Sequence, residues 1–262
     1  MSRNERTAVI TGGAQGIGRR TAELFAERGY RIAIIDLHSS VETVKAIEAK
    51  SGEVLGYAGD IASENSVEQF ARHVFDRYGY ADVLVNNAGI SLISPAEHTE
   101  LSDYRRMLDV NLVAPFLLAK TFGQKMLDAG HGSIVNVASV AGLVGIADRA
   151  AYNASKHGVI GLTRTLAAEW GGRGVRVNAV CPGWVKTEMD TADQARGSYN
   201  DGDITGRIPM ARFASPDDVA RAIFFLADGE ESSFINGHAL TVDGGWTADG
   251  SWESLRLGKR SQ

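Results

Sequence analysis

Short apolar runs alternate with longer amphipathic segments along nearly the whole chain. Runs rich in β-branched residues lie at 7–11, 31–36, 54–58, 82–86, 132–137, 175–180 and 239–242. Segments with helical spacing lie between them, at about 16–28, 40–50, 63–78, 102–128 and 149–171, and another follows the cap residues 215–218. The strands are mostly apolar on both faces, which is typical of a parallel sheet covered by helices. The alternation predicts an α/β fold with a doubly wound, seven-stranded parallel sheet.

One domain accounts for this pattern. The chain has 262 residues, and no Pro/Ser-rich linker divides it, so we expect a single domain over residues 1–246 and a polar tail at 247–262. The 27 basic and 32 acidic residues give a net charge of −5, which does not favour nucleic acid as a partner. No stretch approaches 18 apolar residues, so we expect no membrane span and no membrane partner.

Cysteine and histidine usage indicates the compartment and argues against a metal. Cys181 is the only cysteine and there is no apolar signal segment, which fits a reducing, cytoplasmic location. The six histidines are scattered, without the close pairs that a zinc site uses, so no metal site is predicted.

A glycine-rich turn follows the first apolar run. It reads Thr11-Gly12-Gly13-Ala14-Gln15-Gly16-Ile17-Gly18. Glycines let the backbone turn sharply and approach a pyrophosphate, and the N–H groups of the next helix favour the anion. The turn departs from the G-x-G-x-x-G form because Thr21 occupies the third small position. Between a strand and a helix, it predicts a dinucleotide site in a Rossmann-type fold.

Asp36 ends the second strand, 18 residues after Gly18. This is where such a fold places the acid that bonds the adenosine ribose. A carboxylate there repels a 2′-phosphate, and neither Gln15 nor Leu37 offers a positive charge to hold one. The prediction is therefore NAD rather than NADP. An ordinary polar strand end is the alternative.

Tyr152 and Lys156 lie four residues apart, on one face of the expected helix 149–171. A free tyrosine has a pKa near 10, and a neighbouring positive charge lowers it toward the range useful for proton transfer. A surface Tyr-Lys pair on an amphipathic helix is the alternative.

Several motifs occur together in a fixed order. They are Thr11-Gly12-x-x-x-Gly16-x-Gly18, Asn86-Asn87-Ala88-Gly89, Asn111, Ser139, Tyr152-x-x-x-Lys156 and Pro182-Gly183. In this the chain resembles the short-chain dehydrogenase/reductase family, in its single-domain branch, over nearly all of Thr7 to Trp246. The resemblance implies an NAD-dependent oxidoreductase that transfers hydride between a secondary alcohol or ketone and the nicotinamide.

The resemblance also implies a role for each catalytic residue. Tyr152 would be the general acid/base, and Lys156 would lower its pKa and bond the nicotinamide ribose. Ser139 would bond the substrate oxygen, and Asn111 would hold a water that links Lys156 to solvent. A turn or cap serine and a helix-kink asparagine are the alternatives.

Further residues would hold the cofactor by the same resemblance. Asp60 would bond the adenine amino group, and residues 182–187 would hold the carboxamide. The full expected set is Gly12, Gln15, Gly16, Ile17, Gly18, Asp36, Leu37, Asp60, Ile61, Asn87, Ala88, Gly89, Tyr152, Lys156, Pro182, Gly183, Val185 and Thr187. For Asn86 and Asn87, tying neighbouring strands together is as plausible as touching the cofactor.

Two other functions compete with a dehydrogenase. A catalytically silent NAD-binding sensor or scaffold is one, although degenerate members usually lose the Tyr or the Lys. An epimerase or dehydratase is the other, although that branch usually carries a larger C-terminal domain.

The substrate pocket is expected at 91–96, 140–146 and the loop 184–213, whose polar stretch 193–206 suits a lid. Arg196, Asp201, Asp203 and Arg207 are either substrate contacts or solvent-facing charges. Small residues in the helix that holds Tyr152, together with the resemblance, predict a homodimer or homotetramer.

Overall fold

One parallel sheet organises the computed structural model of the protein, which describes residues 6–196 and 199–256. Its seven strands, within this part of the chain, are β1 (Thr7–Thr11), β2 (Arg31–Asp36), β3 (Val54–Ala58), β4 (Val83–Asn86), β5 (Gly132–Val137), β6 (Val175–Pro182) and β7 (Ala239–Val242). Their order is β3-β2-β1-β4-β5-β6-β7, and every neighbouring pair is parallel. The predicted doubly wound fold is confirmed, and the winding reverses between β1 and β4.

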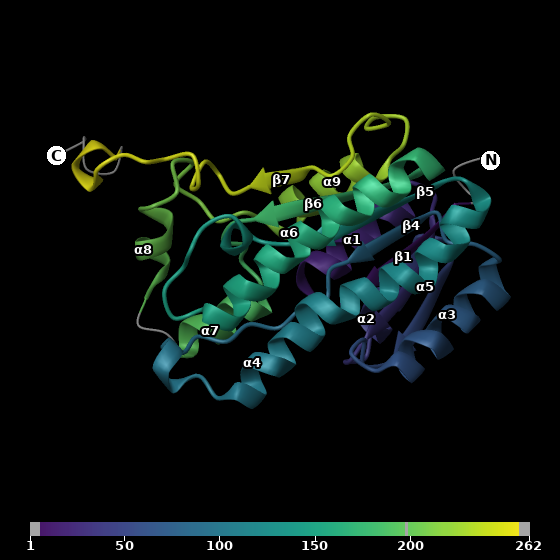
Figure 1. The fold of residues 1–262 in the computed structure, drawn as a ribbon, viewed down its shortest axis with the longest axis horizontal. Helices are drawn as coiled ribbons and strands as arrows, with labels where there is room; N and C mark the ends of the chain where they lie inside the picture. The colour runs from purple at the N-terminus through teal and green to yellow at the C-terminus, as the bar shows by residue number, and fades with distance from the viewer. Residues whose placement is uncertain (1–5, 197–198, 257–262) are drawn as a thin grey trace.

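Helices cover both faces of the sheet (Figure 1). They are α1 (Gly16–Glu27), α2 (Val41–Glu48), α3 (Glu64–Tyr78), α4 (Leu101–Leu108), α5 (Ala114–Ala129), α6 (Ala150–Trp170), α7 (Glu188–Arg196), α8 (Asp201–Thr205) and α9 (Pro216–Ala227). Side chains of α1, α2 and α9 share one buried cluster, and those of α3, α5 and α6 share another. The sheet therefore lies between two apolar layers.

Alternate side chains of a strand contribute to the two apolar layers on opposite faces of the sheet. In β4, Val83 and Val85 join the cluster under α1, α2 and α9, whereas Leu84 joins the cluster under α3, α5 and α6. Successive side chains of a strand point to opposite faces, so a strand buried on both sides must be apolar throughout.

A π-helical turn interrupts the helix that the sequence predicts over 102–128. The structure has α4, then a π turn at Asp109–Val113, then α5. Pro115 has no N–H and cannot donate to the carbonyl of Asn111, four residues earlier, so a regular α-helix cannot continue through this point. The helix expected over 102–128 is therefore present, but it contains a π turn that the sequence analysis did not predict, and Asn111 lies inside that turn.

The polar segment 184–214 contains two short helices, α7 and α8, which the sequence analysis did not predict. The side chain of Asn200 accepts N–H groups of Gly202 and Asp203, and Asp203 accepts the N–H of Asn200, which closes a capping box on α8. Both helices lie beyond the carboxyl ends of the strands (Figure 1). Residues 197–198 of the expected lid lie outside the described residues.

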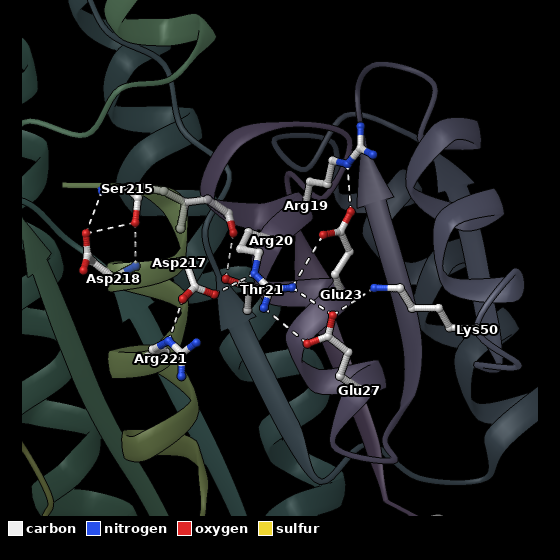
Figure 2. Close-up of polar contacts among 11 residues, drawn as sticks. Arg19, Arg20, Thr21, Glu23, Glu27, Lys50, Ser215, Asp217, Asp218 and Arg221 are labelled. Atoms are coloured by element: carbon white, nitrogen blue, oxygen red, sulfur yellow. Dashed lines mark hydrogen bonds and ion pairs between the residues drawn. The ribbon is translucent and has the colours of Figure 1, made fainter. Parts of the chain in front are cut away.

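The start of α9 carries the predicted cap, since Ser215 and Asp218 form a capping box. Asp217, which lies between these two residues, joins α9 to α1: Arg20 Nε lies 2.7 Å from its Oδ1, and Arg221 Nε lies 2.5 Å from its Oδ2 (Figure 2). Arg20 also pairs with Glu27 at 3.1 Å. These ion pairs join the first and last large helices on one face of the sheet.

The segment after β7 is tied back onto the lid region. Arg207 Nη1 lies 3.0 Å from Asp249 Oδ2, and the Thr247 hydroxyl donates to Asp243 at 2.6 Å. The expected tail is thus tied to the lid region as far as Asp249, residues 251–255 are exposed, and 257–262 lie outside the described residues.

Candidate active site

The glycine-rich turn between β1 and α1 brings backbone into very close contact. Gly12 has a φ of +69°, which glycine adopts without strain. A Cβ on Gly18 would lie 1.9 Å from the carbonyl oxygen of Gly12 and 2.4 Å from Asn87 Nδ2. Only a residue without a side chain fits there, so the first turn of α1 packs directly against the backbone of the glycine-rich turn.

The turn is anchored to the end of β4. Thr11 Oγ1 accepts the N–H groups of Asn87 and Ala88, each at 3.0 Å. The amide of Asn87 donates to the carbonyls of Thr11 and Gly12, also at 3.0 Å. Asn86 donates instead to Asn136 on β5, at 2.8 Å. Both asparagines therefore join neighbouring strands, as one of the two sequence-based interpretations proposed.

Asp36 is buried at the end of β2, with 8% of its surface exposed. Its Oδ2 accepts the N–H of Ala14 at 2.9 Å, and its Oδ1 accepts the N–H of His38 at 2.8 Å. The carboxylate therefore lies against the glycine-rich turn, while Leu37 beside it is exposed.

Asp60 and Ile61 lie at the end of the next strand, β3. Asp60 accepts the N–H of Ala62 at 2.9 Å and pairs with Arg106 Nη2 at 2.9 Å, and Ile61 is buried. These contacts place an α4 arginine at the expected adenine position, which the sequence analysis did not foresee.

Ser139, Tyr152 and Lys156 converge beyond the end of β5. The side chains of Ser139 and Tyr152 are hydrogen-bonded, and Ser139 Oγ also accepts the N–H of Ala141 at 3.1 Å. Lys156 Nζ donates to the carbonyl of Val137 at 2.8 Å and lies 5.6 Å from the centroid of the Tyr152 ring. A phenol, a hydroxyl and an ammonium thus share one small volume.

Burial sets the pKa values of this group. Burial raises the pKa of the Tyr152 phenol, and the hydrogen bond from Ser139 opposes that rise. Burial lowers the pKa of the Lys156 ammonium to about 8. The expected lowering of the Tyr152 pKa by Lys156 stays a prediction.

Asn111 is buried behind this group. Its Oδ1 accepts the N–H of Ile90 at 2.9 Å, and its Nδ2 donates to the carbonyl of Ile90 at 3.0 Å and to Ser155 Oγ at 3.2 Å. A Cβ on Gly89 would lie 3.1 Å from Asn111 Oδ1 and 3.7 Å from Lys156 Nζ. The side-chain atoms of Asn111 thus already bond Ile90 and Ser155. The water that Asn111 is expected to hold for Lys156 stays a prediction, and it would have to bond the backbone carbonyl of Asn111.

The segment from Pro182 to Thr187 returns to the glycine-rich turn. The N–H of Gly183 donates to the carbonyl of Val242 at 3.0 Å, and Val185 forms a β-bridge with Ala214. A Cβ on Gly16 would lie 3.4 Å from Thr187 Cγ2. The residues expected at the two ends of a dinucleotide site therefore lie along one edge of the sheet.

Three residues beside Tyr152 were not recognised together from the sequence. Arg149 Nη1 donates to Ser91 Oγ at 2.7 Å and pairs with Asp193 Oδ2 at 2.9 Å, and Ser91 donates to the same Oδ2 at 2.9 Å. The only signal for Arg149 was its position three residues before Tyr152, at the expected start of the same helix.

The other lid charges have partners away from Tyr152. Asp201 pairs with Lys186 at 2.6 Å, Asp203 caps α8, and Arg207 pairs with Asp249. The side chain of Arg196 lies outside the described residues.

The geometry fits a nicotinamide dinucleotide. The open glycine turn at the start of α1 suits a pyrophosphate, Asp36 suits a ribose, and the Tyr152 group lies at the same edge of the sheet. Within residues 6–196 and 199–256, no group of three or more His, Cys, Asp or Glu side chains is arranged to hold a metal. In the same part of the chain, no helix is long and apolar enough to span a membrane.

Comparison with known proteins gives consistent matches over nearly the full length. A family model described as enoyl-(acyl carrier protein) reductase matches residues 12–247. The D-threitol dehydrogenase of Mycolicibacterium smegmatis is 42% identical over 248 residues, covering 92% of this chain and 93% of that protein.

Solved structures agree. Levodione reductase superposes with a TM-score of 0.90 at 31% identity, covering 93% of this chain and 98% of that one. A protein of Beutenbergia cavernae, provisionally described as an NAD(P) dependent gluconate 5-dehydrogenase and solved with NADP at low occupancy, superposes with a TM-score of 0.87 at 42% identity, covering 93% and 97%.

Proposed function

Because the chain belongs to the short-chain dehydrogenase/reductase family, we propose that it is an NAD-dependent oxidoreductase of secondary alcohols and ketones, with Tyr152 as general acid/base. One observation carries the proposal. The Tyr152 phenol, the Ser139 hydroxyl and the Lys156 ammonium meet beyond the end of β5, at the same edge of the sheet as the glycine-rich turn.

The residues of this chain would transfer one proton to or from the substrate oxygen and would hold that oxygen in place. The bound nicotinamide supplies hydride transfer. The Tyr152 hydroxyl gives its proton to the substrate oxygen during reduction and takes it back during oxidation. The Ser139 hydroxyl bonds the same oxygen and stabilises charge that develops on it. The Lys156 ammonium, held by the Val137 carbonyl, favours the phenolate form of Tyr152 and bonds the nicotinamide ribose.

Asn111 and the cofactor-binding residues complete the proposed site. Asn111 holds the segment at Ile90 and contributes the water position that links Lys156 to solvent. The residues that would hold the cofactor are Gly12, Gln15, Gly16, Ile17, Gly18, Asp36, Leu37, Asp60, Ile61, Asn87, Ala88, Gly89, Tyr152, Lys156, Pro182, Gly183, Val185 and Thr187.

The choice of NAD over NADP depends on Asp36. Its buried carboxylate lies against the turn that would hold the pyrophosphate, where a 2′-phosphate would meet a negative charge. Arg19, the nearest arginine after the turn, pairs with Glu23 at 2.9 Å, which supports the same choice. A relative has NADP bound, so the two cofactors must be compared directly.

The substrate proposal comes partly from relatives. D-threitol is a neutral polyol and gluconate is a sugar acid, so both classes are candidates for this chain. The deciding assay incubates the protein with NAD or NADP and a panel of secondary alcohols while the absorbance of reduced nicotinamide is followed. Cofactor binding without turnover of any alcohol would favour the sensor or scaffold alternative.

Assembly and location are further parts of this proposal. Val113 and Phe116 are apolar and half-exposed where α4 passes into α5, which supports a homodimer or homotetramer. A monomer by light scattering at working concentration would reject it. The lone, buried and unpaired Cys181 supports a cytoplasmic location.

A further inference from the structure

Arg149 and Asp193 form an ion pair at the wall of the proposed substrate pocket. Arg149 immediately precedes α6, Asp193 lies on α7, and Ser91 follows β4. Burial raises the pKa of Tyr199, from the same lid, and the nearby charge of Arg149 lowers it. Three segments far apart in the chain therefore meet at one guanidinium.

The pair is largely withdrawn from solvent. The side chain of Arg149 is 13% exposed and that of Asp193 is 11% exposed. Taking two charges out of water carries a desolvation cost, and apolar residues of similar volume are often at least as stable. Such a pair beside a reacting group is thus better explained by what it recognises than by stability.

The charges of Arg149 and Asp193 both affect the pKa of the proposed catalytic phenol, Tyr152. Arg149 Cζ lies 6.0 Å from the centroid of the Tyr152 ring. The positive charge of Arg149 lowers the pKa of Tyr152, and the negative charge of Asp193 raises it. A substrate bonded to Tyr152 would therefore lie near Arg149, whose guanidinium pairs with Asp193 at 2.9 Å.

We propose that the Arg149–Asp193 pair determines substrate charge, selecting neutral polyhydroxy alcohols over hydroxy acids of the same length. This inference rests on the proposed dehydrogenase function and narrows it to a substrate class.

The physical basis is compensation within the pair. A substrate carboxylate near the pair is attracted by Arg149 but repelled by Asp193. The two effects largely cancel, so they do not offset the free energy that the carboxylate loses when it leaves water. Hydroxyl groups both donate and accept, so they match a carboxylate and a guanidinium at once. The contacts within the pair use only Nη1 of Arg149 and Oδ2 of Asp193, and they do not involve Nη2, Nε or Oδ1.

The inference can be tested with pairs of substrates that have the same carbon chain and differ only in charge. Threitol and threonate differ at one terminal carbon, as do glucitol and gluconate. We expect the wild type to have a higher kcat/KM for each polyol than for its acid. Asp193→Asn leaves the guanidinium without its counter-charge and should raise the acid-to-polyol ratio of kcat/KM about tenfold, which corresponds to about 1.4 kcal/mol. Arg149→Gln leaves the carboxylate and should lower that ratio.

A matched control separates selectivity from a change in net charge. Glu53 pairs with Arg77 at 3.6 Å, next to the amino end of β3 and away from the carboxyl ends of the strands where Tyr152 lies. Glu53→Gln removes one arginine-paired carboxylate and should leave the ratio unchanged. Melting temperature and cofactor fluorescence verify that each variant folds and binds.

The outcomes discriminate between the inference and the function on which it rests. If both variants change polyol and acid turnover by the same factor, the pair only holds the lid and the inference is overturned. It is also overturned by a wild type that prefers threonate. Binding of NAD or NADP with no hydride transfer from any alcohol would instead reject the proposed function, and the inference with it.

Discussion

The ammonium nitrogen of Lys156 lies 5.6 Å from the centroid of the Tyr152 ring, one helical turn away. The same nitrogen donates to the carbonyl of Val137 at 2.8 Å, which fixes it at the end of β5. Ser139, which follows β5, also acts on the Tyr152 phenol, so residues from a helix and from a strand end meet at the proposed acid/base.

Replacing Tyr152 by phenylalanine should remove proton transfer while leaving the cofactor site intact. We expect kcat to fall by about 10²–10⁴, the usual contribution of general acid/base catalysis, with little change in NAD affinity. Steady-state kinetics and cofactor fluorescence measure the two quantities. Tyr80→Phe, in the connection before β4, is the control and should behave as wild type. Wild-type kcat in Tyr152→Phe would reject the acid/base role.

Replacing Lys156 by alanine should lower both kcat and the affinity for NAD. Loss of the ammonium removes the charge that favours phenolate, so turnover should fall, and it removes a donor to the nicotinamide ribose, so NAD should bind more weakly. Titration of cofactor fluorescence and kcat measured at saturating cofactor separate the two effects. Unchanged turnover together with unchanged affinity would contradict the dual role.

Asp36→Arg should reverse the cofactor preference. The change replaces a charge that repels a 2′-phosphate by one that attracts it, so the NAD-to-NADP ratio of kcat/KM should fall by about tenfold or more. Asp36→Asn is the matched variant, because an amide oxygen can still accept the Ala14 N–H without the charge. It should reduce the preference less. A wild type that prefers NADP would show the assignment to be wrong.

Gly18→Ala should damage cofactor binding more than any comparable change outside the turn. The added Cβ would lie 1.9 Å from the Gly12 carbonyl oxygen, so the turn must shift. The control, Gly172→Ala, places a Cβ where nothing lies within 4 Å. Isothermal titration with NAD should show weakened binding for the first variant only, and equal affinities would contradict the close-packed turn.

Acid should weaken the link between α1 and α9. Hydrogen bonds from Arg221 and Arg20 hold the pKa of Asp217 below its usual value of about 3.9. Its folded pKa is depressed, so its contribution to stability is present above pH ~4 and is lost as the pH falls through the folded value. Asp217→Asn should lower the melting temperature at pH 7, and the difference from wild type should shrink below pH ~4. A difference independent of pH would show that the ion pairs contribute nothing.

The sheet could be predicted from the sequence because strands buried on both faces are runs of mostly apolar residues. The run Val83–Asn86 is buried throughout and ends in Asn86, which pairs with Asn136 near the end of the buried run Gly132–Val137. It did not predict α7 and α8, whose surfaces are polar and whose stability comes from caps and lid contacts rather than from a hydrophobic stripe. The π turn was missed because the helical spacing over 102–128 continues through Pro115, although a proline inside a helix removes one backbone hydrogen bond.

The candidate site was predictable where spacing along one element carries it, as for Tyr152 and Lys156. The Arg149–Asp193–Ser91 cluster was not, because its members lie 44 and 58 residues from Arg149 along the chain and meet only through the fold. Arg106 at Asp60 is similar, since an exposed arginine on a helix gives no sign of its partner.

The bonds between Thr11 and Asn87 join residues 76 apart in the chain. A growing polypeptide cannot form them until β4 has left the ribosome and taken its place beside β1. Non-local parallel pairing is slow to form, so the nucleotide loop should acquire its shape late in folding rather than with the first strand and helix. A fragment that ends before β4 would carry the entire glycine motif and still lack a working pyrophosphate cradle.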